Sequence, residues 1–178
     1  MSVVDHDNYS DEHIRSVLAR VKTVAIVGAS ANQVRPSFFV LKYMLSKGYD
    51  VIPVNPGQAG KVICGQMTYA SLADIPRPVH MVDIFRASEA VPAIVDEALA
   101  LDPLPKVIWM QLGIRHDEAA ARAEAAGIDV IMNRCPKIEY ARLAGEIGWA
   151  GVSSNVISSK KPKVLSGFQR FGIVARDD

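Results

Sequence analysis

The feature that most constrains the fold is a short apolar run, Val24-Ala25-Ile26-Val27, that stops at Gly28-Ala29-Ser30. An apolar run without polar alternation is typical of a strand buried on both faces, as in parallel sheets. A helical pattern follows from Pro36, a residue type suited to the first turn of a helix. Strand, tight turn and helix start form the layout of a nucleotide phosphate site, because N–H groups at a helix N-terminus attract anions.

This alternation of strand and helix continues along the chain. Strands are predicted at residues 23–27, 50–54, 79–85, 106–110 and 128–132, and helices at 10–21, 36–48, 91–99, 117–126 and from 136 onward. Only a short helical turn is expected at 70–76. The pattern predicts an α/β fold, a Rossmann-like doubly wound parallel sheet of about five strands with right-handed crossovers in a single domain. We expect this domain to span residues 10–147.

A C-terminal extension is predicted at residues 148–178. It is polar and basic and has no clear periodicity before Gly167-Phe168-Gln169-Arg170-Phe171. Its composition favours a partly flexible tail with a short anchoring strand, because chain ends are often poorly ordered. The alternative is a segment that folds over a ligand or a partner subunit.

Composition excludes several classes of function. The chain has 178 residues, a net charge of +1 and 49% hydrophobic residues, enough for one buried core. The balanced charge argues against a nucleic-acid partner, and no apolar run reaches the roughly 18–20 residues of a membrane span. The N-terminus resembles neither a secretory signal nor a transit peptide, so a cytoplasmic location is expected. Cys64 and Cys135 are too few for a disulfide framework and lack metal-ligand spacing, so we expect no metal.

The turn after the first strand departs from the dinucleotide pattern, which has three glycines in the turn and an acidic residue at the end of the second strand. Here the turn holds one glycine, Gly28, and the second strand ends in Val54-Asn55-Pro56 without a carboxylate. A Gly-Lys-Ser/Thr phosphate loop is also missing. These departures argue against a dinucleotide as the main ligand. An NAD(H)-dependent oxidoreductase or a redox sensor that binds a dinucleotide remains the alternative function.

Cationic and polar residues follow the predicted strands at the sheet edge where parallel sheets bind their ligands. Three of the predicted strand ends bring an Arg or Lys nearby, and an Arg presents a planar fork to phosphate. The sequence therefore predicts a crevice for a polyphosphate ligand. Its polar members are Arg35, Asn55, Lys61, Arg86, Gln111 and Asn133.

Six motifs in this order and spacing resemble those of a known family. They are Gly28-Ala29-Ser30, Arg35-Pro36-Ser37, residues 49–56, Asp83-Ile84-Phe85-Arg86, residues 107–111 and Asn133-Arg134-Cys135. Together they resemble the small stand-alone CoA-binding proteins, which are similar to the CoA-binding Rossmann domain of succinyl-CoA synthetase alpha subunits. The resemblance covers residues 10–143, and its strength comes from the six motifs together, since each alone is unspecific.

The resemblance implies that coenzyme A or an acyl-CoA lies across the carboxyl ends of the strands. The phosphates would be held by the backbone N–H groups of Gly28, Ala29 and Ser30, with added charge from Arg35. The adenosine part would lie against Val54, Asn55 and Pro56, with Lys61 as a further phosphate partner. Ile84, Phe85 and Arg86 would border the pantetheine channel, and Gln111 and Asn133 would supply polar contacts deeper in the site.

Cys135 raises the question of covalent chemistry. It lies between Arg134 and a helix predicted to begin at Pro136, and both features lower a thiol pKa. A thiolate there could form a mixed disulfide with CoA; the alternative is a small buried side chain that packs the helix against the sheet. His116 is interpreted as a solvated residue at a helix start, and His80 as a sheet residue with its bonds satisfied.

No acid–base pair or triad is recognisable, so a binding module without its own chemistry is the main prediction. The synthetase alpha subunits depend on a phosphorylated histidine in a second domain, which the sequence does not contain. A third hypothesis is an acyl-CoA synthetase fragment that needs a partner subunit. Exposed sheet edges and the C-terminal extension make a homodimer possible.

Overall fold

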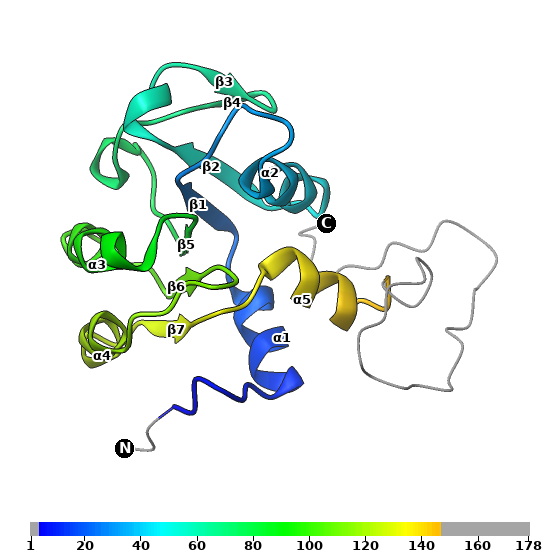
Figure 1. Cartoon of the computed structure of the whole chain (residues 1–178), viewed down its shortest axis with the longest axis vertical. Coiled ribbons are helices and arrows are strands. Elements are labelled where there is room, and N and C mark those ends of the chain that lie inside the picture. Colours follow the sequence, from blue (N-terminus) through cyan, green and yellow to red (C-terminus); the bar gives the residue numbers. More distant parts are fainter. Residues whose placement is uncertain (1–3, 147–178) are drawn as a thin grey trace.

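The computed structural model describes residues 4–146, in which helices cover both faces of a five-stranded parallel sheet (Figure 1). The strands are β1 (Thr23–Val27), β2 (Asp50–Val54), β5 (Met81–Ile84), β6 (Val107–Met110) and β7 (Asp129–Ile131). Their order across the sheet is β2-β1-β5-β6-β7. The predicted single-domain α/β fold with a doubly wound parallel sheet is confirmed. The predicted extension, residues 148–178, lies outside the described residues.

The helices divide between the two faces of the sheet. One face is covered by α1 (Asp11–Arg20), α2 (Pro36–Ser46) and α5 (Pro136–Leu143), the other by α3 (Val91–Leu99) and α4 (Asp117–Ala125). Successive strand residues point to opposite faces. Val24 and Ile26 therefore pack in the first layer, and Ala25 and Val27 in the second. Burial on both faces explains why the β1 sequence is apolar throughout.

Some boundaries differ from the prediction. The third, fourth and fifth strands are shorter by one to three residues than the apolar runs that predicted them. Val79, Ile128 and Met132 are buried but lie outside the paired segments, because an apolar pattern reports burial rather than strand pairing. The prediction also missed a small antiparallel hairpin, β3 (Val62–Ile63) with β4 (Gln66–Met67), because two-residue strands are too short for a periodic signal.

Short 3-10 helices lie in the loops that connect the longer elements. These are η1 (Pro56–Gln58), η2 (Leu72–Asp74) and η3 (Ser88–Ala90). The second of them confirms the short helical turn predicted at residues 70–76. Within residues 4–146, no helix is both long enough and apolar enough to cross a membrane.

The strand order determines where a ligand can bind. The chain leaves β1 toward one side to form β2, then crosses back past β1 to form β5 on its other side. The loops that follow β1 and β5 therefore diverge, and a crevice opens between them. In open α/β sheets, ligands bind in the crevice at this topological switch point.

Candidate functional site

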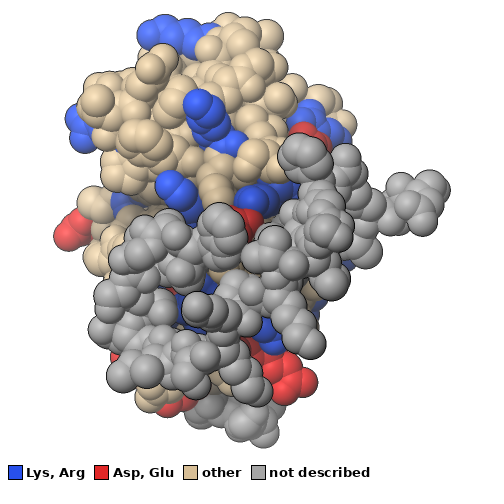
Figure 2. Space-filling view, turned by 90° about the vertical axis from the view of Figure 1, so that its right-hand side faces the viewer, with Lys and Arg blue, Asp and Glu red and all other residues tan. Residues whose placement is uncertain are grey.

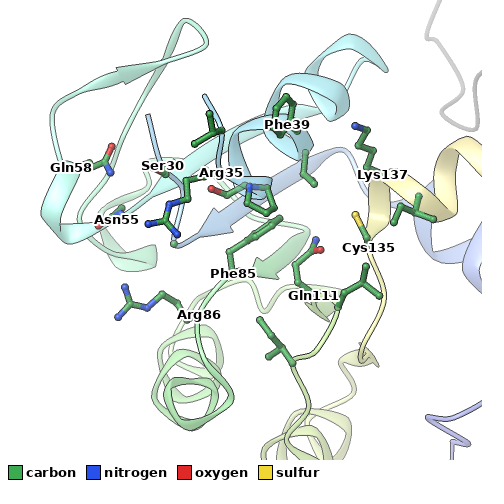
Figure 3. Close-up of a pocket in the computed structure, with 18 residues that line it drawn as sticks. Ser30, Arg35, Phe39, Asn55, Gln58, Phe85, Arg86, Gln111, Cys135 and Lys137 are labelled. Carbon is green, nitrogen blue, oxygen red and sulfur yellow. The ribbon is translucent and has the colours of Figure 1, made fainter. Parts of the chain in front are cut away.

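A cavity of about 810 Å³ opens at the carboxyl ends of β1 and β5 (Figure 3). Its wall is built from the turn after β1, the first turns of α2 and α5, and the loops that follow β2, β5 and β6. Eight of the residues predicted for the site meet there. They are Gly28, Ser30, Arg35, Asn55, Phe85, Arg86, Gln111 and Cys135.

Six other predicted site residues do not line the cavity. Ala29, Val54 and Ile84 are buried in the core, where their side chains contribute to packing. Pro56, Lys61 and Asn133 are exposed outside the cavity wall. Asn133 has a structural contact, because its Oδ1 accepts a hydrogen bond from the Gly113 N–H at 2.8 Å and so ties the β7 loop to the β6 loop.

The prediction also missed part of the wall. The missed residues are Val34, Pro36, Ser37, Phe39, Val40, Gln58, Leu112, Ile114, Lys137 and Ile138. They carry no motif of their own. Most belong to the first turns of the helices that follow β1 and β7, and helix position was the one signal that could have found them.

The turn after β1 needs its glycine for two reasons. Gly28 has a φ of +91°, a conformation that other residues rarely adopt, and a Cβ there would lie 2.7 Å from the Phe85 carbonyl oxygen. The N–H groups of Gly28 and Ala29 both donate to the Val54 carbonyl, at 2.8 and 3.3 Å. They are therefore not free for a phosphate, which corrects the predicted role of these two N–H groups.

Two amide side chains hold this turn in place. Asn55 donates from Nδ2 to the Ala29 carbonyl at 2.8 Å, and its Oδ1 accepts from the Gly57 N–H at 2.9 Å. Gln58 accepts from the Ala31 N–H at 2.9 Å. The amide of Asn55 is thus engaged within the protein, although its side chain also borders the cavity.

Two guanidinium groups on the wall have no partner in the part of the chain that the structure describes. Within residues 4–146, neither Arg35 nor Arg86 forms a hydrogen bond or ion pair through its side chain, whereas Arg77 and Arg142 pair with carboxylates. Arg35 is also the N-cap residue of α2, where no side chain caps the helix. Figure 3 shows the Arg86 side chain on the Asn55 and Gln58 side of the cavity, with Cys135 and Lys137 on the opposite side.

Figure 2 shows the charged side chains on one face of the molecule. On the part of the molecule drawn in colour in Figure 2, Lys and Arg side chains predominate over acidic ones on the upper half of the face. Unpaired cations and an uncapped helix N-terminus on one cavity wall attract anions, and the planar fork of an Arg matches phosphate. This end of the cavity is suited to phosphate groups.

A buried carboxyl group contacts Gln111, a residue of the cavity wall. Asp83 in β5 is completely buried, and the Gln111 Nε2 donates to its two oxygens at 2.9 and 3.1 Å. Burial raises the pKa of Asp83 from 3.8 to about 8, and the hydrogen bond from Gln111 opposes part of that rise. Because the Gln111 amide nitrogen faces Asp83, its oxygen is left to face away from that carboxyl group.

The pKa of the Cys135 thiol shifts in the direction opposite to the predicted one. It is buried at the N-cap position of α5, and burial raises the pKa of its thiol, with the Asp83 charge acting in the same direction. Backbone N–H groups of α5 lower that pKa in part. Arg134 does not help, since its guanidinium donates to the Asp7 carbonyl at 3.1 Å and lies over the Tyr9 ring. The predicted lowering of the thiol pKa is therefore wrong, because desolvation outweighs the helix terminus.

The histidines near the sheet edges have structural partners. His116 caps α4, where its Nδ1 accepts from the Ala119 N–H at 3.1 Å, which confirms the helix-start interpretation. His80 accepts from the N–H groups of Lys22 and Thr23 at 3.1 and 3.3 Å. Over the part of the chain that the structure describes, no three His, Cys, Asp or Glu side chains gather in a way that could hold a metal ion.

Comparison with known proteins identifies relatives of this arrangement. The family model described as a CoA binding domain matches residues 22–141. The uncharacterized protein YneT of Bacillus subtilis (strain 168) is 37% identical over 134 residues, which are 75% of this chain and 96% of YneT. The solved structure of cell-free ID.343 from Thermus thermophilus is 38% identical with a TM-score of 0.71, over 76% of this chain and 99% of that one.

A third relative has the same extent. A hypothetical protein from Pyrococcus horikoshii OT3 is 36% identical, with a TM-score of 0.72, over 80% of this chain and 98% of that one. Each relative is thus matched along nearly its whole length by about three quarters of this chain. The phosphate-suited cavity lies within the matched residues, and the chain belongs to the CoA-binding domain family.

Proposed function

We propose that this protein binds coenzyme A in the cavity between β1 and β5, as a binding module without a reaction of its own. The observation that carries the proposal is a pair of guanidinium groups, Arg35 and Arg86, on the wall of a cavity at the topological switch point. Neither group has a partner among residues 4–146. Membership of the CoA-binding domain family supports coenzyme A as the phosphate ligand.

The ligand would lie along the cavity with its phosphates at the arginines and its pantetheine arm pointing toward Cys135. Its phosphates would contact Arg35, Arg86 and the backbone N–H groups at the very start of α2, beside the N-cap residue Arg35, where no side chain caps the helix. Its pantetheine arm would pass Phe85 and Gln111 toward Cys135 at the other end. Buried donors and acceptors such as those of Gln111 suit the amide groups of that arm.

The absence of a catalytic role rests on the groups nearest the cavity. Cys135 is a thiol on the wall, and burial raises its pKa, which disfavours the reactive thiolate at neutral pH. His116 is occupied as a helix cap, and Asp83 is completely buried under Gln111. None of these three groups is presented as a general base to a ligand in the cavity.

Calorimetric titration with CoA and with NAD⁺ tests the proposal. CoA is expected to bind at least about tenfold more tightly than NAD⁺. Arg35→Ala and Arg86→Ala should each weaken CoA binding by roughly ten- to hundredfold, because a hydrogen bond to a charged group contributes about 1.5–3 kcal/mol. Arg15→Ala, at an exposed position on α1, is the matched control and should bind CoA like the wild type.

Two outcomes would count against the proposal. If the wild-type protein failed to bind CoA, or bound NAD⁺ more tightly, the ligand would be wrong. If CoA bound but neither arginine variant changed its affinity, the cavity would not be the phosphate site.

A further inference from the structure

Exposed apolar side chains are concentrated at the cavity. Eight large apolar residues are exposed among residues 4–146, and half of them line its wall. These four are Val34 at 77%, Phe39 at 49%, Leu112 at 56% and Ile138 at 44% relative exposure. Single exposed apolar residues are ordinary on protein surfaces, but several on the wall of one cavity indicate that the cavity binds an apolar group.

Three of these side chains come from different elements. Phe39 lies in the first turn of α2, Leu112 follows Gln111 directly after β6, and Ile138 lies in the first turn of α5. Figure 3 shows Phe39, Gln111, Cys135 and Lys137 together on the side of the cavity away from Arg86. Phe39 therefore lies at a different end of the cavity from the Arg86 guanidinium, as do Gln111 and Lys137, the chain neighbours of Leu112 and Ile138. The fourth exposed residue, Val34, precedes Arg35 and belongs with the cationic end.

This arrangement bears on what is attached to the CoA thiol. With the phosphates at the cationic end, the thiol end of CoA reaches the residues around Gln111 and Cys135. A free thiol is small and would leave Phe39, Leu112 and Ile138 in contact with water. An acyl chain on the same sulfur extends the ligand onto these side chains and removes apolar surface from water on both partners.

We propose that the site takes an acyl-CoA with an uncharged apolar acyl group, which lies against Phe39, Leu112 and Ile138. This inference rests on the proposed function, since the phosphates determine which way the ligand lies. A carboxylated acyl group is disfavoured by the surroundings. The cation at this end, Lys137, lies 5.7 Å from the ring centroids of Phe39 and of Tyr43, so it already interacts with two aromatic rings.

Titration of the full chain with CoA and with acetyl-, butyryl-, hexanoyl- and octanoyl-CoA tests the inference. Affinity should rise by about two- to fourfold per methylene over the first members of the series, because burying a methylene contributes up to about 0.8 kcal/mol. Leu112→Ser and Ile138→Ser should each weaken octanoyl-CoA binding about five- to tenfold more than they weaken free CoA binding.

The matched control is Leu104→Ser. Leu104 is the same residue type as Leu112 and is 41% exposed, but it precedes β6 and so lies at the opposite edge of the sheet. This variant should bind every member of the series like the wild type. A drop in octanoyl-CoA affinity in Leu104→Ser as large as that in Leu112→Ser would overturn the assignment of the acyl group to this end of the cavity.

The remaining outcomes separate the inference from the proposed function. Equal affinity for CoA and all acyl-CoAs would overturn the acyl assignment and leave CoA binding in place. Tighter binding of glutaryl-CoA than of butyryl-CoA would overturn the apolar character of the acyl group and indicate a role for Lys137. No binding of CoA or of any acyl-CoA would overturn the proposed function itself.

Discussion

Asp83 is a fully buried carboxyl group in contact with Gln111 of the cavity wall. It lies in the central strand of the sheet with no exposed surface, and Gln111 is the side chain that donates to it. A charged carboxylate in such a place is costly, so the proton-bound form is favoured and the pKa rises to about 8. Asp83 therefore influences both the orientation of the Gln111 amide and the stability of the fold.

This pKa predicts a specific pH dependence of stability. Because the folded-state pKa of about 8 lies above the ordinary value of 3.8, the folded protein retains a proton that the unfolded chain loses between these values. The contribution of Asp83 to the free energy of unfolding therefore falls as pH rises from about 4 to about 8. Urea unfolding at several pH values across this range should show this loss in the wild type and a smaller loss in Asp83→Asn.

The control for this measurement is Asp102→Asn, which makes the same change at an exposed carboxylate that has no hydrogen bond or ion pair among residues 4–146. Its stability should follow the wild-type pH dependence. The same pH dependence in Asp83→Asn as in the wild type would show that Asp83 titrates at an ordinary pKa.

The turn after β1 is held in place by the end of β2 and by the loop after it. Gly28 and Ala29 donate to Val54, and the Asn55 amide spans from Ala29 to Gly57. These two elements are separated along the chain by α2 and β2. The geometry of the turn therefore depends on β1 and β2 being paired in the observed register.

Asn55→Ala should affect stability and binding together. Loss of two hydrogen bonds is expected to lower the free energy of unfolding by about 1–3 kcal/mol. The freed turn should also weaken CoA binding, even though the Asn55 amide is engaged within the protein. Denaturant unfolding and calorimetry on the same samples measure both effects, and Asn8→Ala, an exposed asparagine near the N-terminus, should change neither. Unchanged CoA affinity in a destabilised Asn55→Ala would separate the turn from the binding site.

The whole sheet contributes to the cavity, because its wall combines residues that follow β1, β2, β5, β6 and β7. No single loop makes the site, so the site exists only when the sheet is formed. A ligand that binds this cavity binds the folded state alone and stabilises it by mass action.

Thermal unfolding with added ligand measures this coupling. At a CoA concentration of about 100 times its Kd, the folded state should gain about 2.7 kcal/mol, which corresponds to a Tm increase of roughly 5–10 °C. NAD⁺ at the same concentration should raise the Tm much less, and the Arg86→Ala variant should need more CoA for an equal shift. A Tm that does not respond to CoA would contradict binding to the folded state.

Local patterns were sufficient to predict the order of the elements. Apolar runs such as Val24–Val27 predict strands because burial on both faces demands an unbroken apolar sequence, and Pro36 and Pro136 begin helices where they were expected. Because parallel strands place their carboxyl ends at one edge, the chemistry-bearing residues could also be assigned to that edge. Arg35, Arg86 and Gln111 were predicted in this way.

The other properties of the site could be learned only from the tertiary structure, because they depend on contacts between residues distant in the chain. Whether Cys135 holds a reactive thiol depends on desolvation by neighbours from other elements, and whether the Gly28 N–H is free depends on Val54. The apolar residues at the far end of the cavity carry no sequence motif, since Phe39, Leu112 and Ile138 come together only when three elements pack. The sequence alone thus predicts a nucleotide site at one sheet edge, and only the packed structure shows which residues line the cavity there, Arg35 and Arg86 together with the apolar Phe39, Leu112 and Ile138.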